Sequence, residues 1–174
     1  NPGSVDYGST GVGSSPHLLM EEVALNAKVK LNHVPYKGNA DMQQALLGGH
    51  VMAQSDGTGW DQFVDSGKMR LLVTFGEKRT TRWPDVPTAL ELGYKVSSTS
   101  PYGLAGPKGM DPAVVKVLHD AFKKALLDPA SLDVMKQLNQ EPVYRDSADY
   151  KAWAQATYTK EKGLIEYLGL MAKD

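Results

Sequence analysis

Several features that would point to particular classes of protein are absent from this sequence. It has no cysteine, so neither a disulfide framework nor a thiolate zinc site is available. No fully apolar run is longer than that of Leu71–Val73, which is far too short to span a bilayer. The 19 Lys and Arg residues, against 20 Asp and Glu, do not cluster, which argues against a nucleic-acid partner.

The sequence also lacks an initiating methionine and a signal peptide. It opens at Asn1-Pro2-Gly3, which indicates an excised fragment or a processed product, so we expect the missing signal to carry no information on location. Its 174 residues, 41% hydrophobic and 22% charged, have the composition of a globular domain.

The motifs of common enzyme classes are incomplete. Gly8-x4-Gly13-Ser14-Ser15 has the spacing of a nucleotide-binding P-loop, but Ser14 stands where a lysine must reach the phosphates. No G-x-S-x-G elbow occurs. An α/β hydrolase that uses Ser14 or Ser15 with His17 remains an alternative. We expect no metal site, because the four histidines are dispersed: His17, His33, His50 and His119.

Strand-like runs alternate with helical patterns over the first 95 residues. Strands are predicted at residues 5–9, 29–35, 51–55 and 69–75. Helices are predicted from an N-cap at Ser15, from an N-cap at Asn39, over residues 58–66, and from the capping box Thr88-x-x-Glu91. This alternation with short links predicts an α/β fold with a mostly parallel sheet flanked by helices.

The rest of the chain has a different pattern. An extended crossover is predicted over residues 96–104 and a short strand over residues 142–144. Helices are predicted after Asp111, after Asp128 and from Ser147. Their apolar faces need a partner surface, which is either a second copy of the chain or the lobe of residues 1–94, and we expect the second copy, in a homodimer.

The stretch from Ser9 to His17 is the main candidate for a binding site. It is a glycine-rich link from strand to helix, where backbone N–H groups can converge on an anion at the positive end of the helix dipole. The stretch contains no Lys or Arg, which favours a small carboxylate over a polyphosphate. A tight structural turn is the simpler alternative.

Two further links are predicted to join this glycine loop. Residues 36–39 and 55–58 also follow strands, and the carboxyl ends of parallel strands lie along one edge of a sheet. Lys37 is equally consistent with a solvated charge, and Asp56 with a helix N-cap.

A series of motifs in this order and spacing resembles the Bug-type receptors of tripartite tricarboxylate transporters. The resemblance covers essentially the whole chain. The motifs are Asn1-Pro2-Gly3, the glycine loop from Tyr7 to Leu18, Val34-Pro35-Tyr36-Lys37-Gly38, Leu47-Gly48-Gly49, Asp85-Val86-Pro87-Thr88 and Tyr102-Gly103-Leu104-x-Gly106-Pro107-x-Gly109.

The resemblance implies a periplasmic, non-enzymatic receptor with the type II periplasmic-binding-protein fold and no cofactor. Residues 1–95 would form the ligand-binding lobe, and residues 96–174 the crossover strand and C-terminal helices of an incomplete other lobe. The receptor would pass a mono-, di- or tricarboxylate to membrane transporter subunits; a ligand sensor for signalling is a further alternative. The implied ligand-binding residues are Ser9, Thr10, Gly11, Val12, Gly13, Ser14, Ser15, His17, Asn39, Asp56 and Thr58.

Overall fold

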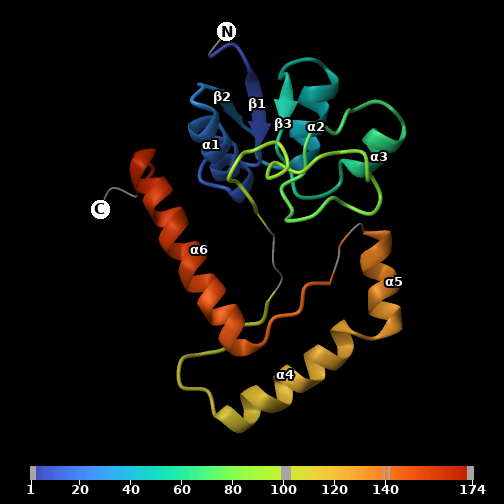
Figure 1. Ribbon diagram of the computed structural model, residues 1–174, viewed down its shortest axis with the longest axis vertical. Helices are drawn as coiled ribbons and strands as arrows, with labels where there is room; N and C mark the ends of the chain where they lie inside the picture. Colours follow the sequence, from blue (N-terminus) through green and yellow to red (C-terminus); the bar gives the residue numbers. More distant parts are fainter. Residues whose placement is uncertain (1–2, 99–102, 139, 141, 172–174) are drawn as a thin grey trace. The chain divides into compact units, whose positions relative to one another are not determined.

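The chain forms two compact units. The computed structural model describes residues 3–98, 103–138, 140 and 142–171 (Figure 1). One unit comprises Asn1–Ser100 with Glu161–Asp174, and the other comprises Pro101–Lys160. The middle of the predicted crossover, residues 99–102, lies outside the described residues. The lobe boundary expected between residues 95 and 96 stays a prediction.

The first unit is built on three parallel strands in the order β2-β1-β3 (Figure 1). They are β1 (Asp6–Ser9), β2 (Asn32–Pro35) and β3 (Ala53–Gln54). In β1, Tyr7 lies opposite His33 of β2 and Ala53 of β3. Helices α1 (Ser15–Ala27), α2 (Asn39–Leu47) and α3 (Asp61–Asp65) follow the strands in turn. The predicted α/β fold with a parallel sheet flanked by helices is confirmed.

Two predicted helix caps are shifted by one residue. The N-cap of α1 is Ser14, whose hydroxyl accepts the N–H of His17 at 3.4 Å, so the prediction of Ser15 was wrong. The N-cap of α2 is Gly38, and Asn39 is already helical. The Asn39 amide therefore does not cap the helix, and it donates to the backbone oxygen of Thr58 at 3.3 Å.

Two predicted strands are shorter than expected because the preceding helices end in left-handed turns. Lys28 adopts φ 53°, and the N–H of Val29 donates back to Ala24 at 3.0 Å, so the chain is still turning there. Gly49 at φ 73° does the same after α2, where the N–H of His50 donates to Ala45. The strands begin only after these turns are complete.

Two other predicted strands do not form. Residues 69–75 contribute only a single bridge, between Thr74 and Thr88, and residues 142–144 pair with no strand among the described residues. An apolar run becomes a strand only when a neighbour completes its hydrogen-bond ladder.

Two predicted helices also differ from the structure. The predicted helix 58–66 is reduced to α3. The Thr88–Glu91 capping box forms both reciprocal bonds, at 2.8 and 3.2 Å, but it closes a turn that ends at Gly93 rather than a helix.

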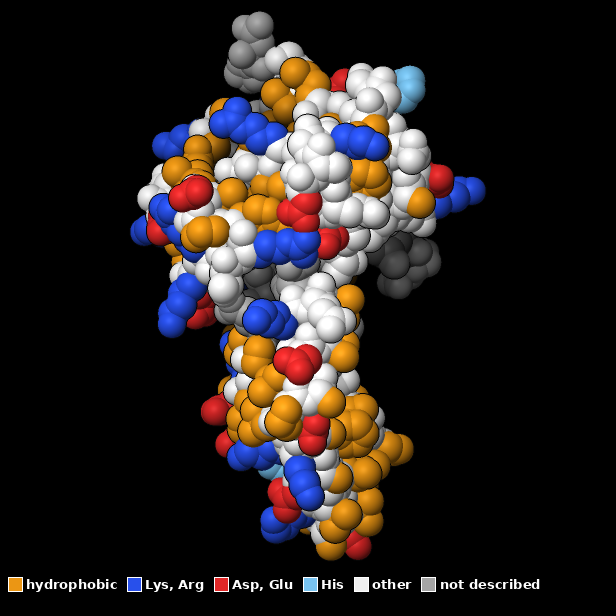
Figure 2. Space-filling model, turned by 90° about the vertical axis from the view of Figure 1, so that its right-hand side faces the viewer, with side chains coloured by type: hydrophobic (Ala, Val, Ile, Leu, Met, Phe, Trp, Pro, Cys, Tyr) orange, Lys and Arg blue, Asp and Glu red, His pale blue; other side chains and the backbone are white. Residues whose placement is uncertain are grey.

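Two of the predicted helices belong to the second unit, and the residues of the third are divided between the units at residue 161. They are α4 (Pro112–Leu126), α5 (Pro129–Gln137) and α6 (Ser147–Tyr167). Asp111 and Asp128 cap α4 and α5 by accepting backbone N–H bonds, and both helices begin where they are predicted. Apolar side chains of α4 stay uncovered, with Phe122 52% exposed. Figure 2 shows hydrophobic side chains gathered over the helical part of the molecule. No described helix is long and apolar enough to cross a membrane.

The central strand leaves no room for a side chain at Gly8. A Cβ there would lie 2.9 Å from Cγ of Met42 and 3.2 Å from Cε2 of Tyr36. Met42 belongs to α2, which packs against β1 and β3, and its side chain is completely buried. The missing side chain at Gly8 thus lets α2 and Tyr36 close over the sheet.

We expect Gly8→Ala to lower the free energy of unfolding by about 1–3 kcal/mol, because the contacting Met42 atom sits close to its backbone and cannot swing away. Gly57→Ala is the matched control, since nothing lies within 4 Å of its Cβ position and it should change stability by less than about 0.5 kcal/mol. Urea unfolding of both variants measures the difference. Equal stabilities would show that α2 does not need the close approach.

Candidate functional site

The carboxyl ends of the three strands bring three links together. The N–H of Tyr36 donates to the oxygen of Ser9 at 2.9 Å, and the N–H of Ser55 donates to the oxygen of Gly8 at 3.0 Å. The Asn39–Thr58 bond joins the second link to the third. The glycine loop, which follows the middle strand, therefore lies between the other two links, as the parallel order predicts.

The glycine loop is closed on itself by bonds that converge on one carbonyl. The oxygen of Gly11 accepts the hydroxyl of Ser14 at 2.7 Å, the N–H of Ser14 at 3.3 Å and the hydroxyl of Ser9 at 3.2 Å. Gly11 and Gly13 adopt φ 129° and 74°, which a residue with a side chain rarely does. Ser9 and Ser14 therefore shape the loop from within, and Ser9 has no exposed surface.

Other groups of the loop are open. The N–H groups of Thr10, Val12 and Ser15 have no hydrogen-bond acceptor within the part of the chain that the structure describes. Val12 is 60% exposed and Ser15 is also exposed, so a ligand or water can reach this side of the loop. Ser15 is the first residue of α1, where the helix dipole favours negative charge, and Thr10 and Val12 lie in the loop that leads into it. The arrangement suits a small anion.

A buried polar network lies beneath the loop. The N–H of Gly13 donates to Nδ1 of His17 at 3.0 Å, and Nε2 of that ring lies 3.9 Å from Glu21. The His17 ring stacks on His33, with centroids 3.9 Å apart, and Nε2 of His33 lies 2.7 Å from Oγ of Ser9.

The same network extends into the sheet through Glu21, which accepts the hydroxyl of the buried Tyr7 at 2.8 Å. Burial, reinforced by this bond and by the Glu21 charge, raises the pKa of the Tyr7 hydroxyl, which stays protonated. Tyr7 therefore ties the histidine network on α1 to the central strand.

Both histidines of the network are uncharged near neutral pH. Burial lowers the pKa of His17, while the nearby Glu21 opposes the shift. Burial, together with repulsion from His17, lowers the pKa of His33 to about 4. A neutral ring can accept the N–H of Gly13, which a doubly protonated ring cannot.

Asp56 is a loop-forming carboxylate and not a helix cap. Its Oδ1 accepts the N–H groups of Gly57 at 2.7 Å and of Thr58 at 3.4 Å, whereas α3 begins only at Asp61. The amide of Gln43, a buried residue of α2, donates to its Oδ2 at 3.4 Å. Burial raises the pKa of Asp56, and these hydrogen bonds oppose the shift.

Sequence reasoning missed two members of the site. His33 lies in the strand predicted over residues 29–35, and only the pairing of β1 with β2 reveals that it meets Ser9. Gln43 lies within a helix whose apolar residues carried the prediction, and its contact with Asp56 depends on where β3 ends. Neither residue has a local signal in the sequence.

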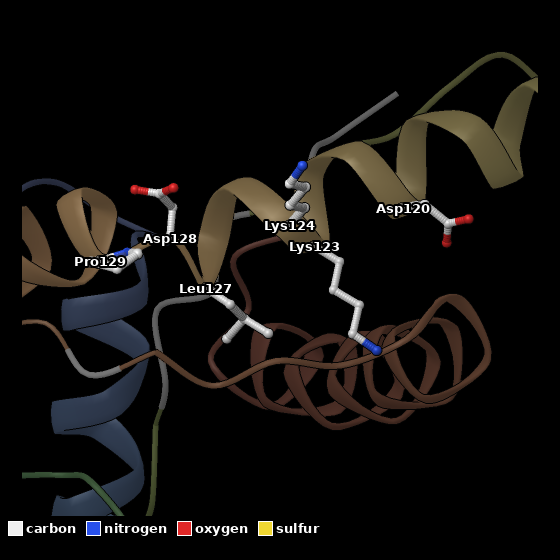
Figure 3. A pocket seen from close by; sticks show the side chains of 6 residues that line it. All are labelled: Asp120, Lys123, Lys124, Leu127, Asp128 and Pro129. Carbon is white, nitrogen blue, oxygen red and sulfur yellow. The ribbon is translucent and has the colours of Figure 1, made fainter.

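A hollow at the junction of α4 and α5 is a weaker candidate. Figure 3 shows that its lining side chains point in different directions and do not converge on one centre. They are Asp120, Lys123, Lys124, Leu127, Asp128 and Pro129. Within the described residues, no group of three or more His, Asp or Glu could hold a metal ion. The edge of the parallel sheet is therefore the candidate site.

Solved structures define the class of this chain. A TctC solute-binding protein from Polaromonas, 30% identical, superimposes with a TM-score of 0.80 over 94% of this chain and 57% of its own. A protein of R. palustris solved with adipate is 23% identical, with a TM-score of 0.80 over 97% and 57% of the two chains. MatC from Rhodopseudomonas palustris, solved with bound malate, is 22% identical, with a TM-score of 0.72 over 94% and 57%. The fold is that of the periplasmic solute-binding proteins.

The family follows from the sequence. Residues 1–170 match the TctC family, the tripartite tricarboxylate transporter family receptor, and the chain belongs to this family. The UPF0065 protein in the gbd 5' region of Cupriavidus necator is 50% identical over 98% of this chain and 52% of its own length. BugT of Bordetella pertussis is 29% identical over 99% and 53%. The resemblance to Bug-type receptors is confirmed, and the chain spans about half the length of these relatives.

The lowered histidine pKa values predict an acid-sensitive fold. Because His33 binds a proton less readily in the folded chain, unfolding takes up a proton once the pH falls below about 6.5, and the free energy of unfolding should decrease until about pH 4. His33→Gln should flatten this decrease, whereas substitution of the exposed His50 by Gln should leave it unchanged. Denaturant titrations between pH 7.5 and 3.5 test this; parallel curves for all three proteins would contradict it.

Proposed function

We propose that this chain provides the ligand-binding lobe of an extracytoplasmic receptor that captures a small carboxylate. The observation that carries the proposal is the set of open N–H groups at Thr10, Val12 and Ser15, at the positive end of α1, in a loop without Lys or Arg. Membership of the TctC family supports it. The adipate and malate bound to the R. palustris proteins, which share the fold, support a carboxylate ligand.

In this proposal the glycine loop contacts the ligand directly, and Asn39, Asp56 and Thr58 line the same cleft. Ser9 and Ser14 act by shaping the loop, because their hydroxyls are already engaged. Residues 1–95 form one lobe, and residues 96–174 contribute to another that closes over the ligand. The matched relatives are nearly twice as long as this chain, so the complete cleft needs surface that these residues do not supply.

A hydrolase is the weaker reading of the same loop. A general base must have a free ring nitrogen within reach of the nucleophile. Nδ1 of His17 accepts the N–H of Gly13, and Nε2 faces Glu21. Neither nitrogen is therefore placed to accept a proton from the hydroxyl of Ser14 or Ser15. This engagement supports a binding role without catalysis.

The cellular setting follows from the same proposal. A receptor of this family would work in the periplasm and deliver its ligand to membrane transporter subunits. The homodimer expected from the exposed faces of α4, α5 and α6 stays a prediction. Those faces could equally be covered by the further length that the relatives possess.

Gly13→Val should abolish carboxylate binding by the complete receptor. Nothing lies within 4 Å of the Cβ position of Gly13, so the damage comes from its φ of 74°, which a β-branched residue strongly disfavours. Gly163→Val in α6 is the control for added bulk, because nothing lies within 4 Å of its Cβ position, it needs no left-handed backbone, and it belongs to none of the three links. Calorimetric titration with a panel of organic acids measures binding. Full affinity in Gly13→Val would remove the loop from the site.

Asp56→Asn should separate two roles of this side chain. The amide oxygen of Asn can still accept the N–H groups of Gly57 and Thr58, and the Gln43 amide can turn so that its oxygen accepts the new NH2, so stability should be kept. If Asp56 accepts a ligand hydroxyl, the variant should bind malate at least about tenfold more weakly, the loss of one charge-assisted bond, and bind adipate unchanged. Calorimetry with both acids decides. Equal affinities for malate in variant and wild type would restrict Asp56 to shaping its loop.

A further inference from the structure

Two stacked imidazoles contact the glycine loop at two separate points. His17 holds it at Gly13, through the bond from the Gly13 N–H to Nδ1. His33 holds it at Ser9, whose Oγ lies 2.7 Å from Nε2 and also contacts the N–H and the oxygen of Gly11. The two rings lie face to face, with an interplanar angle of 22°, and His17 is only 5% exposed. A change in the protonation or position of either ring therefore alters a hydrogen bond to the loop.

The hydrogen bonds specify the protonation state of His17. An imidazole nitrogen accepts a hydrogen bond only when it carries no proton, so the ring proton of His17 must be on Nε2, which faces Glu21 at 3.9 Å. A second proton, on Nδ1, would meet the N–H of Gly13 and expel it. Protonation of both rings would also place two positive charges on rings whose centroids are 3.9 Å apart.

We propose that the His17–His33 pair is the positioning element of the glycine loop, and that the loop keeps its anion-binding shape only while both rings are uncharged. The proposal rests on the function proposed above for its reference to anions, but its central contact, from Gly13 to His17, is independent of any ligand. It assigns to His33 a role in positioning the loop through Ser9.

The groups that surround the pair act in opposite directions. Burial disfavours a second proton on His17, and Glu21 of α1 favours one. Burial and repulsion from His17 both disfavour a second proton on His33 of β2. Tyr7 of β1 donates to Glu21 and thereby satisfies part of its charge. The pair should therefore stay uncharged through the neutral range. On acidification His33 should take up a proton only as the pH falls toward about 4, and the Gly13 bond should be lost once Nδ1 of His17 is protonated.

Nuclear magnetic resonance of the 174-residue chain tests this without a ligand. Long-range proton–nitrogen spectra should assign His17 the tautomer with its proton on Nε2. The Gly13 amide should be protected from hydrogen exchange at pH 7, relative to the unbonded amide of Val12, and its chemical shift should follow the titration of the pair on acidification. His50→Gln, which alters an exposed histidine, should reproduce the wild-type curves.

Two substitutions separate positioning from packing. In His17→Asn the amide oxygen can stand in for Nδ1 and cannot be protonated, so the Gly13 amide should stay protected and lose its acid dependence. His17→Phe fills the stack but offers no acceptor, so Gly13 should exchange at least about tenfold faster at pH 7. A Gly13 amide that ignores both substitutions, or a His17 proton on Nδ1, would overturn the proposal.

Titration of the complete receptor with adipate and malate at pH 7 connects the pair to binding. His17→Asn should retain wild-type affinity, and His17→Phe should lose at least about tenfold. Equal affinities for His17→Phe and wild type would refute the positioning role in binding. Absence of binding by the wild type, with the Gly13 amide still titrating as described, would refute the proposed function and support the contact between the pair and the loop.

Discussion

The burial of one short strand determines where everything else in the first unit can lie. β1 has a neighbour on each side, and its residues Tyr7 and Ser9 have no exposed surface. The chain that follows such a strand must continue from the strand's carboxyl end. In a parallel sheet the carboxyl ends of the neighbouring strands lie at the same edge. The glycine loop and the links of residues 36–39 and 55–58 therefore lie at one edge of the sheet. The parallel strand order alone brings them together.

That constraint also explains which parts of the fold could be predicted from the sequence. Signals that act within a few residues were accurate to within one position. Asp111 and Asp128 cap their helices, and Thr88 and Glu91 form their reciprocal bonds. The caps predicted at Ser15 and Asn39 are each shifted by one residue. Strand length depends on a partner that is distant in the sequence, so residues 69–75 were assigned a strand that they do not form. The capping box shows the same limit, because a correct local motif did not guarantee a helix beyond it.

In the candidate site, too, local features could be predicted from the sequence and long-range contacts could not. The loop from Ser9 to His17 could be located from its glycines and its position between strand and helix, and the structure adds which of its groups are open. The sequence could not distinguish Ser15, which faces solvent, from Ser9, which is buried against His33. That distinction depends on strand pairing and on ring stacking between residues far apart in the chain. The burial of Ser9 therefore favours a role in shaping the loop over direct contact with a ligand.

If the glycine loop binds its ligand as proposed, through backbone dipoles rather than cations, one lobe alone can supply only a limited binding free energy. Hydrogen bonds from the N–H groups of Thr10, Val12 and Ser15 to a carboxylate would contribute about 1.5–3 kcal/mol each. Loss of translational and rotational freedom costs about 4–15 kcal/mol, which is of similar size to the three bonds together. Binding by this edge alone should therefore be weak and rapidly reversible. A second surface that closes on the ligand would add contacts without repeating that entropic cost, which is the physical reason to expect the cleft of a receptor to need both lobes.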